Sequence, residues 1–515
     1  IALYYVVIVG WSMVYMYIII TGQSYKWARC DNPWNTYFCQ SEQETEECIE
    51  KYKDESYHYW NGTCTNVSLS DLHHPQNLST VGSAEEFFEY NILQKQDSFD
   101  LDLYSSDNFN IKMSITLALA WFLSVLALLK GVKVLGRLSL FTATVPYIII
   151  GILFARGVTL EGAYDGIRFY LLEPKFEKIA QLDTWRAALT QACFSLSIGI
   201  GGMLSLSSHN KRSHPCYRDA LIIIGADSFM SIFGGVAVFS TLGYISFKTN
   251  VPIEKVVQSG VNLAFVAYPT AISSMPVPWL WAFCFFFMLF ILGISTIFGY
   301  LEAFALCILD QFPVLHNRRG LVITLIAFVG NIITVAIFCF PAGIHWFQVL
   351  NDFLGSFSLS IVIILELVCI NFCYGPCRFF RDIQAMFGSA RSCFKKVFGA
   401  SGWYIRFAQF VTAPILSIIV LIATFDPPHI SYGKDGRKFD YPDWVHTIGW
   451  AIGAVPILFV PLFMIINPLT FLRKGQKLSE VISVQPEHPA IRYNLPKRIS
   501  DEDMRDRKGS EDVEE

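Results

Sequence analysis

Ten long apolar runs, separated by shorter polar stretches, dominate the pattern of hydrophobic and polar residues along this chain. A helix that crosses a bilayer needs about 20 predominantly apolar residues, and each run meets or nearly meets that length. The pattern therefore predicts an all-α membrane protein whose transmembrane domain covers residues 1–470. The ten predicted helices lie near residues 1–20, 113–129, 138–156, 187–208, 220–247, 277–309, 321–341, 346–374, 404–424 and 445–467.

The composition agrees with a membrane protein. Of the 515 residues, 53% are hydrophobic and only 16% are charged, whereas a soluble domain carries about 25% charged residues. Ile1 stands inside an apolar run with no methionine before it. We therefore expect the natural N-terminus to lie further upstream.

The charges of the connecting segments predict the orientation in the membrane. Basic residues gather in alternate connections, at 128–137, 209–218, 316–320 and 377–396, and short basic connections face the cytoplasm. The long segment 21–111 is then extracellular, and we expect a multi-pass protein of the plasma membrane. Residues 471–515 mix charges of both signs, which predicts a disordered cytoplasmic tail at the C-terminus.

Sequons and cysteines also mark segment 21–111 as extracellular. The sequons predict N-glycosylation of Asn61, Asn66 and Asn77. Clustered cysteines on the oxidising side favour disulfides, and the four here are Cys30, Cys39, Cys48 and Cys64. A zinc site made by these cysteines with His73 and His74 is a weaker alternative, because Cys-x-x-Cys spacing is absent.

Residues 197–202, Ser-Ile-Gly-Ile-Gly-Gly, place a weak helix-forming stretch in the middle of an apolar run. Glycine is a poor helix former, and lipid cannot hydrogen-bond a loosened backbone. Broken helices with freed carbonyls form ion and substrate sites in secondary transporters, and Gln191, Ser195 and Ser197 add polar side chains here. A small-residue face for helix packing is the alternative.

Asp227 lies well inside the apolar run 220–247. A carboxylate there costs several kcal/mol unless it is paired or binds an ion. Ser231 lies one turn further along the same helical face, so the two side chains could ligate one ion. A helix cap, or a hydrogen bond to a neighbouring group, is the alternative.

Ser295 and Thr296 are adjacent hydroxyl residues beside Gly293 in the run 277–309. Oxygen ligands suit a hard monovalent cation, but serine and threonine often donate to carbonyls of their own helix. Both interpretations stay open on this evidence. Glu302 and Glu366 also lie in apolar runs, and we interpret them as buried residues at helix contacts.

Two classes of membrane protein are disfavoured. The chain has no Gly-x-x-x-x-Gly-Lys-Ser/Thr motif and no large cytoplasmic domain, which argues against an ATP-driven pump. It also lacks the regularly spaced arginines of a voltage sensor.

Several motifs together resemble the neurotransmitter:sodium symporter family, solute carrier family six, over most of the chain. The strongest is WARCDNPWNTYFC at 27–39, which resembles the family's second extracellular loop. The stretch FSLSIGIGG at 194–202 resembles its unwound sixth helix, and YRDALII, STLGY, LDQFP, YGPCRFFRDIQAMFG and YPDWVHTIGW resemble later segments. The resemblance implies an inverted-repeat transporter fold of the bacterial leucine transporter type, with about ten of its twelve helices present.

The same resemblance implies roles for individual residues, each taken from the matching position of the family pattern. The substrate pocket would be lined by Ile1, Tyr5, Phe194, Ser197, Ile198 and Ile200, with Phe194 as a lid. Sodium would bind at two sites, Ser195 with Asp227, and Ser295 and Thr296 with the carbonyl of Leu292. Chloride contacts fall on Gln191, Ser195 and Ser231, gate acids on Asp310 and Asp352, and a disulfide on Cys30 and Cys39.

Departures from the family pattern bear on ions and substrate. Asp227 stands where most members have asparagine, and its charge would replace that of chloride, so we expect sodium to be required and chloride dependence to be weak. Ser295 replaces the aspartate of monoamine and GABA carriers, which favours amino acids. Asn351 and Asp352 replace the usual extracellular gate acid, so that its salt bridge shifts to Asp352 or is lost.

The resemblance thus implies sodium-coupled uptake of an amino acid or an amino-acid-derived neurotransmitter by alternating access. No covalent chemistry is needed, so an enzyme is not expected. A monoamine or GABA-like substrate, an ion channel, and a transport-inactive receptor or scaffold are the alternatives. The expected partners are a small-molecule substrate and membrane lipid, with no nucleic acid.

Overall fold

Long apolar helices make up most of the computed structural model, which describes residues 1–54, 56–66, 81–129, 132–210, 214–249, 251–256, 260–387, 392–424, 431–433 and 438–473. Eight helices in these ranges are long and apolar enough to cross a membrane. They lie in α1 (Ala2–Ile20), α4 (Ile111–Leu129), α5 (Val132–Val158), α9 (Cys216–Thr249), α12 (Pro278–Gln311), η8 with α13 (Pro313–Arg318 and Arg319–Phe338), the helix Gly343–Tyr374, and α20 (Asp443–Arg473).

The two other predicted runs take different forms. The run at 187–208 forms two helices, α7 (Leu182–Ser195) and α8 (Gly202–Ser207), with a non-helical stretch between them. The run at 404–424 consists of α18 (Trp403–Phe407), the π-helical η11 (Ala408–Thr412) and α19 (Ala413–Thr424). All ten apolar runs are therefore helical in their described residues, and one is interrupted.

The helix Gly343–Tyr374 also changes its hydrogen-bond spacing along its length. It begins as α14 (Gly343–Leu350), continues as the π-helical η9 (Asn351–Ser358) and α15 (Leu359–Val368), and ends as η10 (Cys369–Tyr374). Single-turn π segments inside α-helices are frequent at functional sites. The predicted gate residue Asp352 lies in the first of the two π segments.

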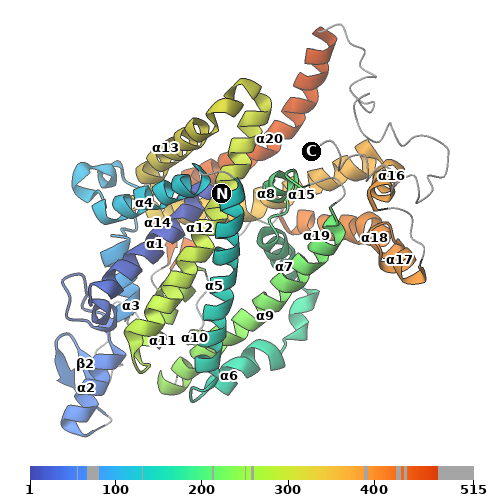
Figure 1. Ribbon diagram of the computed structural model, residues 1–515. Helices are drawn as coiled ribbons and strands as arrows, with labels where there is room; N and C mark the ends of the chain where they lie inside the picture. The colour runs from blue at the N-terminus through green and yellow to red at the C-terminus, as the bar shows by residue number, and fades with distance from the viewer. Residues whose placement is uncertain are drawn as a thin grey trace. The chain divides into compact units, whose positions relative to one another are not determined.

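Two compact units contain the described residues. The first takes its residues from 1–210, 218–363 and 416–454, and the second from 211–217, 364–415 and 455–515. In the first unit α12 packs against α1, α4, α5 and α13, and α1 also packs against α4 (Figure 1). The residues of α1 are apolar on nearly every face of the helix, as expected of a helix that lies inside a bundle.

The α1–α12 contact is close because of a glycine. A Cβ added to Gly293 of α12 would lie 2.5 Å from Cγ2 of Val9 in α1, so only glycine fits there. Aromatic rings fill the neighbouring space, where Tyr15 of α1 stacks on Phe286 of α12 with ring centroids 4.2 Å apart. The backbones of these two helices are thus fixed against each other next to Leu292.

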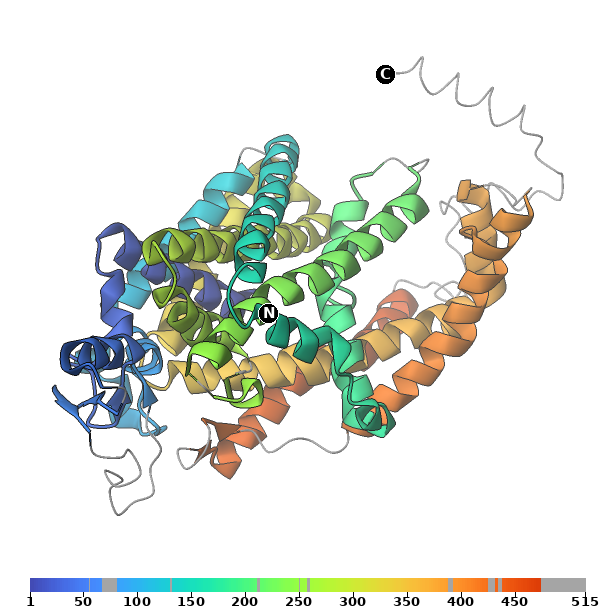
Figure 2. The ribbon, with the colours of Figure 1, turned by 90° about the horizontal axis from the view of Figure 1, so that it is seen from below.

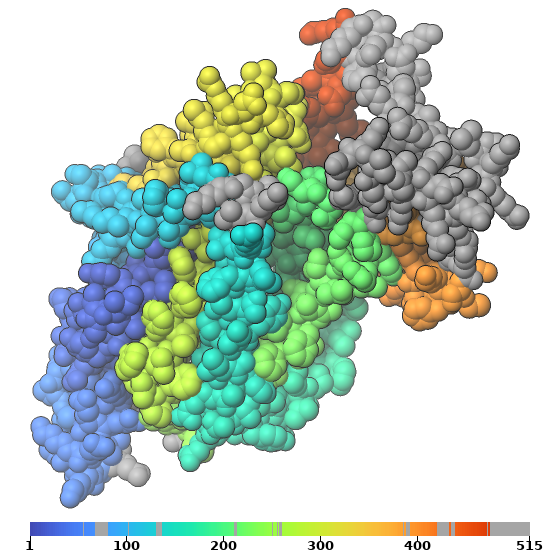
Figure 3. Space-filling model, viewed as in Figure 1, coloured from blue at the N-terminus to red at the C-terminus, as the bar shows by residue number. Residues whose placement is uncertain are grey.

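The described residues of segment 21–111 form a lobe of short elements, whose α2 and β2 stand apart from the long helices (Figures 1, 2 and 3, blue). Two disulfides, Cys30–Cys39 and Cys48–Cys64, close its loops. Its helical elements are η1 (Ser24–Ala28), α2 (Glu42–Tyr52), α3 (Ser83–Glu86), the π-helical η2 (Phe87–Ile92), η3 (Leu101–Tyr104) and η4 (Ser106–Asn108). Its strands are β1 (Cys39–Gln40), parallel to β4 (Val81–Gly82), and β2 (His58–Trp60), antiparallel to β3 (Thr63–Thr65).

A buried carboxylate joins two parts of this lobe. Glu86 is fully buried, and its oxygens accept hydrogen bonds from the Asn35 side chain at 3.1 Å and the Thr36 amide at 2.9 Å. The Thr36 hydroxyl donates to it as well. Asn35 and Thr36 belong to the loop that the Cys30–Cys39 disulfide closes. The charge of Glu86 therefore fixes that loop on α3.

The connections between the long helices contain further short elements. Their helical members are α6 (Ala163–Ile167), η5 (Arg168–Leu172), η6 (Phe176–Ala180), α10 (Ile253–Val256), η7 (Leu263–Ala267), α11 (Tyr268–Ser273), α16 (Pro376–Phe387) and α17 (Cys393–Phe398). The strands β5 (Ser431–Tyr432) and β6 (Phe439–Asp440) pair antiparallel before α20.

Polar contacts hold the second unit together internally. The side chains of Asn371 and Gln409 lie 3.4 Å apart, where Gln409 donates to Asn371. The Tyr217 hydroxyl donates to the carbonyl of Phe398 at 2.6 Å. The guanidinium of Arg406 lies over the ring of Phe380, 4.8 Å from its centroid.

Candidate functional site

The break between α7 and α8 is the centre of the candidate site. Its backbone enters the left-handed region at Ser197 (φ 54°), Gly199 (φ 76°) and Gly201 (φ 82°). Residues other than glycine rarely adopt this conformation. A Cβ on Gly199 would also lie 2.7 Å from Cγ1 of Ile363. The stretch is therefore a true interruption of the helix and not a continuous packing face.

Ser195 and Asp227 meet at this break. The hydroxyl of Ser195, the last residue of α7, donates to Oδ1 of Asp227 over 2.6 Å. Asp227 lies well past the start of α9 at Cys216, so it does not cap that helix. Two residues predicted for one sodium site thus lie in direct contact, although they belong to different helices.

Gln191 and Ser231, the two other residues predicted to contact chloride, lie near this pair in sequence but make no described contact with Ser195 or Asp227. Ser231 lies one turn after Asp227 on α9, and Gln191 lies one turn before Ser195 on α7. Both are exposed. Helical spacing within α9 suggested Ser231 as the partner of Asp227, whereas the described hydrogen bond of Asp227 comes from Ser195.

The second predicted sodium site is a local feature of α12. The hydroxyls of Ser295 and Thr296 both donate to the carbonyl of Leu292, at 2.8 and 3.0 Å. Three candidate oxygen ligands therefore lie together on one turn of helix. The arrangement is also the ordinary back-bonding of serine and threonine in helices, so these contacts fit both interpretations.

The predicted substrate residues come from α1 and from the break. Tyr5 of α1 packs edge-to-face against Tyr300 of α12, with ring centroids 6.4 Å apart, and its hydroxyl interacts with Thr296. Tyr5 thus lies beside the second predicted sodium site. The other five, Ile1, Phe194, Ser197, Ile198 and Ile200, are half-buried except for Ile198, whose exposed fraction is 41%.

The predicted gate residues differ in their surroundings. Asp352 is half-buried and accepts hydrogen bonds from the amides of Gln348 at 2.9 Å and Asn351 at 3.2 Å. Asp310 lies near the end of α12 and is exposed. Of the two, only Asp352 is held in a fixed position by described hydrogen bonds.

Glu302, interpreted from the sequence as a residue at a helix contact, makes an ion pair. Both of its oxygens accept from one nitrogen of Arg319, at 2.6 and 2.7 Å. Arg319 begins α13, so the pair joins α12 to α13. Glu366 lies in α15 and is half-buried.

The cysteines of the lobe are fully used. Cys30 pairs with Cys39, as the family resemblance implies, and Cys48 pairs with Cys64. These disulfides leave no thiolate to bind zinc, so the zinc alternative is wrong for the loop cysteines. Asn61 and Asn66 are exposed, as a glycosylation site requires. Asn77, His73 and His74 lie outside the described residues.

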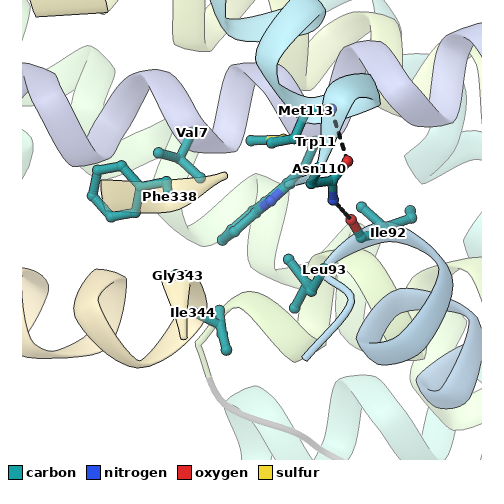
Figure 4. Close-up of a pocket in the computed structure, with 9 residues that line it drawn as sticks. All are labelled: Val7, Trp11, Ile92, Leu93, Asn110, Met113, Phe338, Gly343 and Ile344. Atoms are coloured by element: carbon teal, nitrogen blue, oxygen red, sulfur yellow. Dashed lines mark hydrogen bonds between the residues drawn. The ribbon is translucent and has the colours of Figure 1, made fainter. Parts of the chain in front are cut away.

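A small cavity lies next to α1 but is separate from these residues (Figure 4). Its volume is about 10 Å³, close to the minimum for a single water molecule. Most residues around it are apolar, such as Trp11 and Phe338, and Asn110 is already bonded to the carbonyl of Ile92 and the amide of Met113. We do not assign a ligand to it.

His345 is a polar residue that the sequence pattern did not single out. Its side chain is fully buried at the start of α14, and it contacts Tyr441, Gln96 and Asp97. A lone histidine at the edge of the apolar run 346–374 was the only local signal. Its partners lie 96 and 249 positions away, so no local pattern could identify them.

Similar proteins were found in two comparisons. The pattern of the sodium:neurotransmitter symporter family matches residues 1–471. The chain is 34% identical over 508 residues to the sodium-dependent transporter snf-5 of Caenorhabditis elegans, covering 96% of this chain and 67% of that protein. It is 34% identical over 497 residues to the sodium- and chloride-dependent glycine transporter 2 of Xenopus laevis, covering 95% and 60%. It is 31% identical over 495 residues to the sodium-dependent dopamine transporter of Bos taurus, covering 95% and 65%.

The similarity extends over nearly the whole chain, which spans about two thirds of the length of these relatives. It agrees with the bundle of long apolar helices and with the interrupted helix at 196–201. The chain therefore belongs to the sodium:neurotransmitter symporter family, and its fold is that of the leucine-transporter type.

Proposed function

We propose that this protein is a sodium-coupled symporter that takes up amino acids across the plasma membrane by alternating access. The observation that carries the proposal is the 2.6 Å contact between Ser195 and Asp227 at the end of a broken helix. A carboxylate among apolar helices costs several kcal/mol unless it is paired or binds an ion. The relatives described above are named as sodium-dependent transporters, which supports sodium as that ion.

Two sodium sites are proposed. The first uses Ser195, Asp227 and backbone carbonyls freed by the break, which together offer both oxygen ligands and a negative charge. The second uses the carbonyl of Leu292 and the hydroxyls of Ser295 and Thr296. Each hydroxyl that donates its proton to a carbonyl keeps its oxygen lone pairs, so it can still bind a cation.

The substrate would lie between α1 and the break. Tyr5 and Ile1 form one wall, and Ser197, Ile198 and Ile200 form the other, with Phe194 closing over the bound molecule. The inward sodium gradient and the membrane potential then drive uptake. Each positive charge that moves inward gains about 2.3 kcal/mol per 100 mV.

Chloride is proposed to be dispensable, because the carboxylate of Asp227 supplies a negative charge at the first sodium site. Gln191, Ser195 and Ser231, the residues that match the chloride contacts of the family, would then surround a carboxylate in place of the anion. Replacing Asp227 with asparagine removes this charge while keeping the shape of the side chain. The variant is therefore expected to require chloride.

The test is radiolabelled uptake by the full-length protein in proteoliposomes. A panel of amino acids, dopamine and GABA would be offered in sodium chloride, choline chloride and sodium gluconate. We expect uptake of at least one amino acid to be lost in choline and to keep more than half its rate in gluconate. Uptake confined to dopamine or GABA contradicts the substrate class, and complete loss in gluconate contradicts the role of Asp227.

Variants separate the proposed ligands from ordinary helix residues. Ser195→Ala, and Ser295→Ala combined with Thr296→Ala, are expected to raise the sodium concentration for half-maximal uptake by about tenfold, since each removes oxygen ligands. Thr324→Ala is the matched control, because Thr324 makes the same kind of bond to its own helix, at 2.9 Å to the carbonyl of Gly320. If Thr324→Ala raised the sodium concentration for half-maximal uptake equally, Ser295 and Thr296 would have only a structural role.

A further inference from the structure

The short helices η7 and α11 lie in a bridging segment, residues 261–275, that connects α9 to α12 along the chain. All of its side chains are buried or half-buried. The ring of Phe265 stacks on that of Phe286 in α12, with centroids 5.9 Å apart, and the ring of Tyr268 stacks on Phe285 at 4.0 Å. The bridging segment contains none of the proposed ion and substrate ligands, so its close packing needs another explanation.

Pro269 removes a hydrogen-bond donor from the bridging segment. In an α-helix the carbonyl of Phe265 would accept from the N–H of residue 269, four positions later. Proline has no N–H, and its ring crowds that carbonyl. The helix has π spacing just before it, in η7, where the N–H of Tyr268 donates to the carbonyl of Leu263, five positions earlier. The carbonyl of Phe265 therefore lacks its regular α-helical donor.

Tyr15 of α1 supplies a donor to this carbonyl. Its hydroxyl donates to the carbonyl oxygen of Phe265 over 2.6 Å. The exposed fractions of Tyr15 and Phe265 are 0% and 1%, so bulk water does not compete for the bond. Leaving a buried carbonyl without its partner costs the desolvation of that group. The two residues lie 250 positions apart, so no local sequence pattern reveals the pair.

Two further hydrogen bonds attach the other end of the bridging segment. The indole N–H of Trp27 in η1 donates to the Ser273 hydroxyl at 2.8 Å. The hydroxyl of Tyr244 in α9 donates to the carbonyl of Ser274 at 2.9 Å. Apolar residues of α9 and of the segment also form one buried cluster, Leu242, Ile245, Ala267 and Ala271. The segment is thus bonded to α1 near its start and to α9 and the lobe near its end.

These attachments connect helices that carry different proposed ligands. The helix α9 contains Asp227 of the first proposed sodium site. The helix α12 contains Ser295 and Thr296 of the second site, and it packs against α1, which carries Tyr5. A change in the spacing between α9 and the α1–α12 pair therefore strains the bonds of the bridging segment.

We propose that Tyr15 is a positioning residue, whose hydrogen bond to Phe265 replaces the donor that Pro269 lacks and holds the bridging segment on α1. The segment then acts as a strut that keeps α9 in step with α1 and α12 during transport. Loss of the Tyr15 hydroxyl leaves the proposed ligands in place but lets α9 move without the other two helices. Transport is then slower, while the affinity for substrate changes little.

The effect on transport rests on the proposed function, so the first measurement is independent of transport. Hydrogen–deuterium exchange of the purified full-length protein would follow residues 261–275. Tyr15→Phe removes only the hydroxyl and is expected to speed exchange there about tenfold, because a buried carbonyl loses its partner. Pro269→Ala returns an N–H at the position that an α-helix uses, so Tyr15→Phe/Pro269→Ala is expected to recover slow exchange. Unchanged exchange in Tyr15→Phe overturns the proposal, whether or not the protein transports.

Two controls decide whether that recovery is specific. Tyr4→Phe removes another buried hydroxyl from α1, one without a hydrogen bond in the part of the chain that the structure describes, and should leave exchange unchanged. Tyr244→Phe removes the bond to Ser274, which Pro269→Ala does not replace, so Tyr244→Phe/Pro269→Ala should exchange as fast as Tyr244→Phe. Equal recovery in both double variants, or in neither, contradicts the assigned role of Tyr15.

Sodium-dependent uptake at equal surface abundance gives the readout that a purely structural role would not change. Tyr15→Phe is expected to lower the maximal rate about fivefold with little change in KM, because a step of the conformational cycle is slowed and substrate contacts are kept. Tyr15→Phe/Pro269→Ala should recover most of the rate. A normal maximal rate in Tyr15→Phe refutes the strut, whereas absence of sodium-dependent uptake in the wild type refutes only the proposed function.

Discussion

Glu302 and Arg319 illustrate how single charged residues are accommodated among apolar helices. The side chain of Glu302 has an exposed fraction of only 3%, and that of Arg319 has 28%. One guanidinium nitrogen lies within 2.7 Å of both carboxylate oxygens. Removing one member of such a pair leaves the other charge without compensation, which costs more than the pair contributes.

Glu302→Gln is therefore expected to lower the free energy of unfolding by on the order of 2 kcal/mol, with the partial exposure of Arg319 limiting the loss. Thermal denaturation of the detergent-purified protein would measure it. Combining the change with Arg319→Met should recover part of the stability, because no unpaired charge remains. Glu161→Gln, at an exposed turn, is the control and should change the melting temperature little. An equal loss in the control would contradict this account.

Pairs within one helix could be predicted from the sequence, whereas pairs between helices could not. Leu292, Ser295 and Thr296 are related by helical spacing, and they lie together as expected. For Asp227 the same spacing suggested Ser231, but the bonded partner is Ser195, 32 positions earlier. Only the family resemblance placed Ser195 and Asp227 in one site, and neither source of information grouped His345 with Tyr441.

Among the elements, the interrupted helix shows most clearly how the amino-acid sequence determines the backbone conformation. Three residues between α7 and α8 adopt positive φ, and two of them are glycines. Gly199 also faces Ile363, whereas Gly201 and Gly202 have no atom within 4 Å of an added Cβ. Substitutions at these glycines can therefore distinguish the strain of a left-handed backbone conformation from a steric clash of the added Cβ.

Alanine substitutions along the break should have graded effects. Gly202→Ala is expected to be neutral, because this position is helical and open. Gly201→Ala should cost about 1 kcal/mol through its backbone conformation alone. Gly199→Ala adds a steric clash and should abolish most uptake at equal surface abundance. Equal uptake by Gly199→Ala and Gly202→Ala would show that the break is not constrained.

The sequence predicted that a helix is present at each apolar run better than it predicted where the regular α-helix begins, ends or changes to a π-helix. Every apolar run formed helix over most of its described part, since length and hydropathy suffice for that inference, and only the run 187–208 is broken between α7 and α8. The π-helical segments η9, η10 and η11 could not be predicted. They differ from an α-helix in the spacing of their backbone hydrogen bonds, and a run of apolar residues looks the same with either spacing. The segment η9 contains Asn351 and Asp352, so the regular α-helical hydrogen-bond spacing is lost at the predicted gate.

At the scale of the molecule, all the proposed ion and substrate residues belong to the first unit. The two proposed sodium sites use α7, α9 and α12, and Tyr5 of α1 lies next to the second. An ion that binds the folded protein and not the unfolded chain stabilises it by about 2.7 kcal/mol at 100 times its dissociation constant. Sodium should therefore raise the melting temperature of the intact protein.

Thermal denaturation in sodium chloride and choline chloride of equal ionic strength tests this expectation. The melting temperature is expected to be several degrees higher in sodium. Ser195→Ala and the Ser295→Ala/Thr296→Ala double variant should each lose part of the difference, and Thr324→Ala should keep it. Equal melting temperatures in the two salts would argue against sodium sites in the folded protein.

The buried carboxylate of Glu86 connects the chemical maturation of the chain with its packing. Its hydrogen-bond donors on Asn35 and Thr36 belong to the ring that the Cys30–Cys39 disulfide closes. While that ring is open these two donors are not held in place, so part of the hydrogen bonding of the buried carboxylate is lost and the packing of α3 against η1 and η7 is weakened. We expect a newly made chain to leave this region open to chaperones and oxidoreductases until the thiols are oxidised. Oxidation of Cys30 and Cys39 is then expected to restore these hydrogen bonds, so that the redox state of two thiols influences how firmly a distant helix packs.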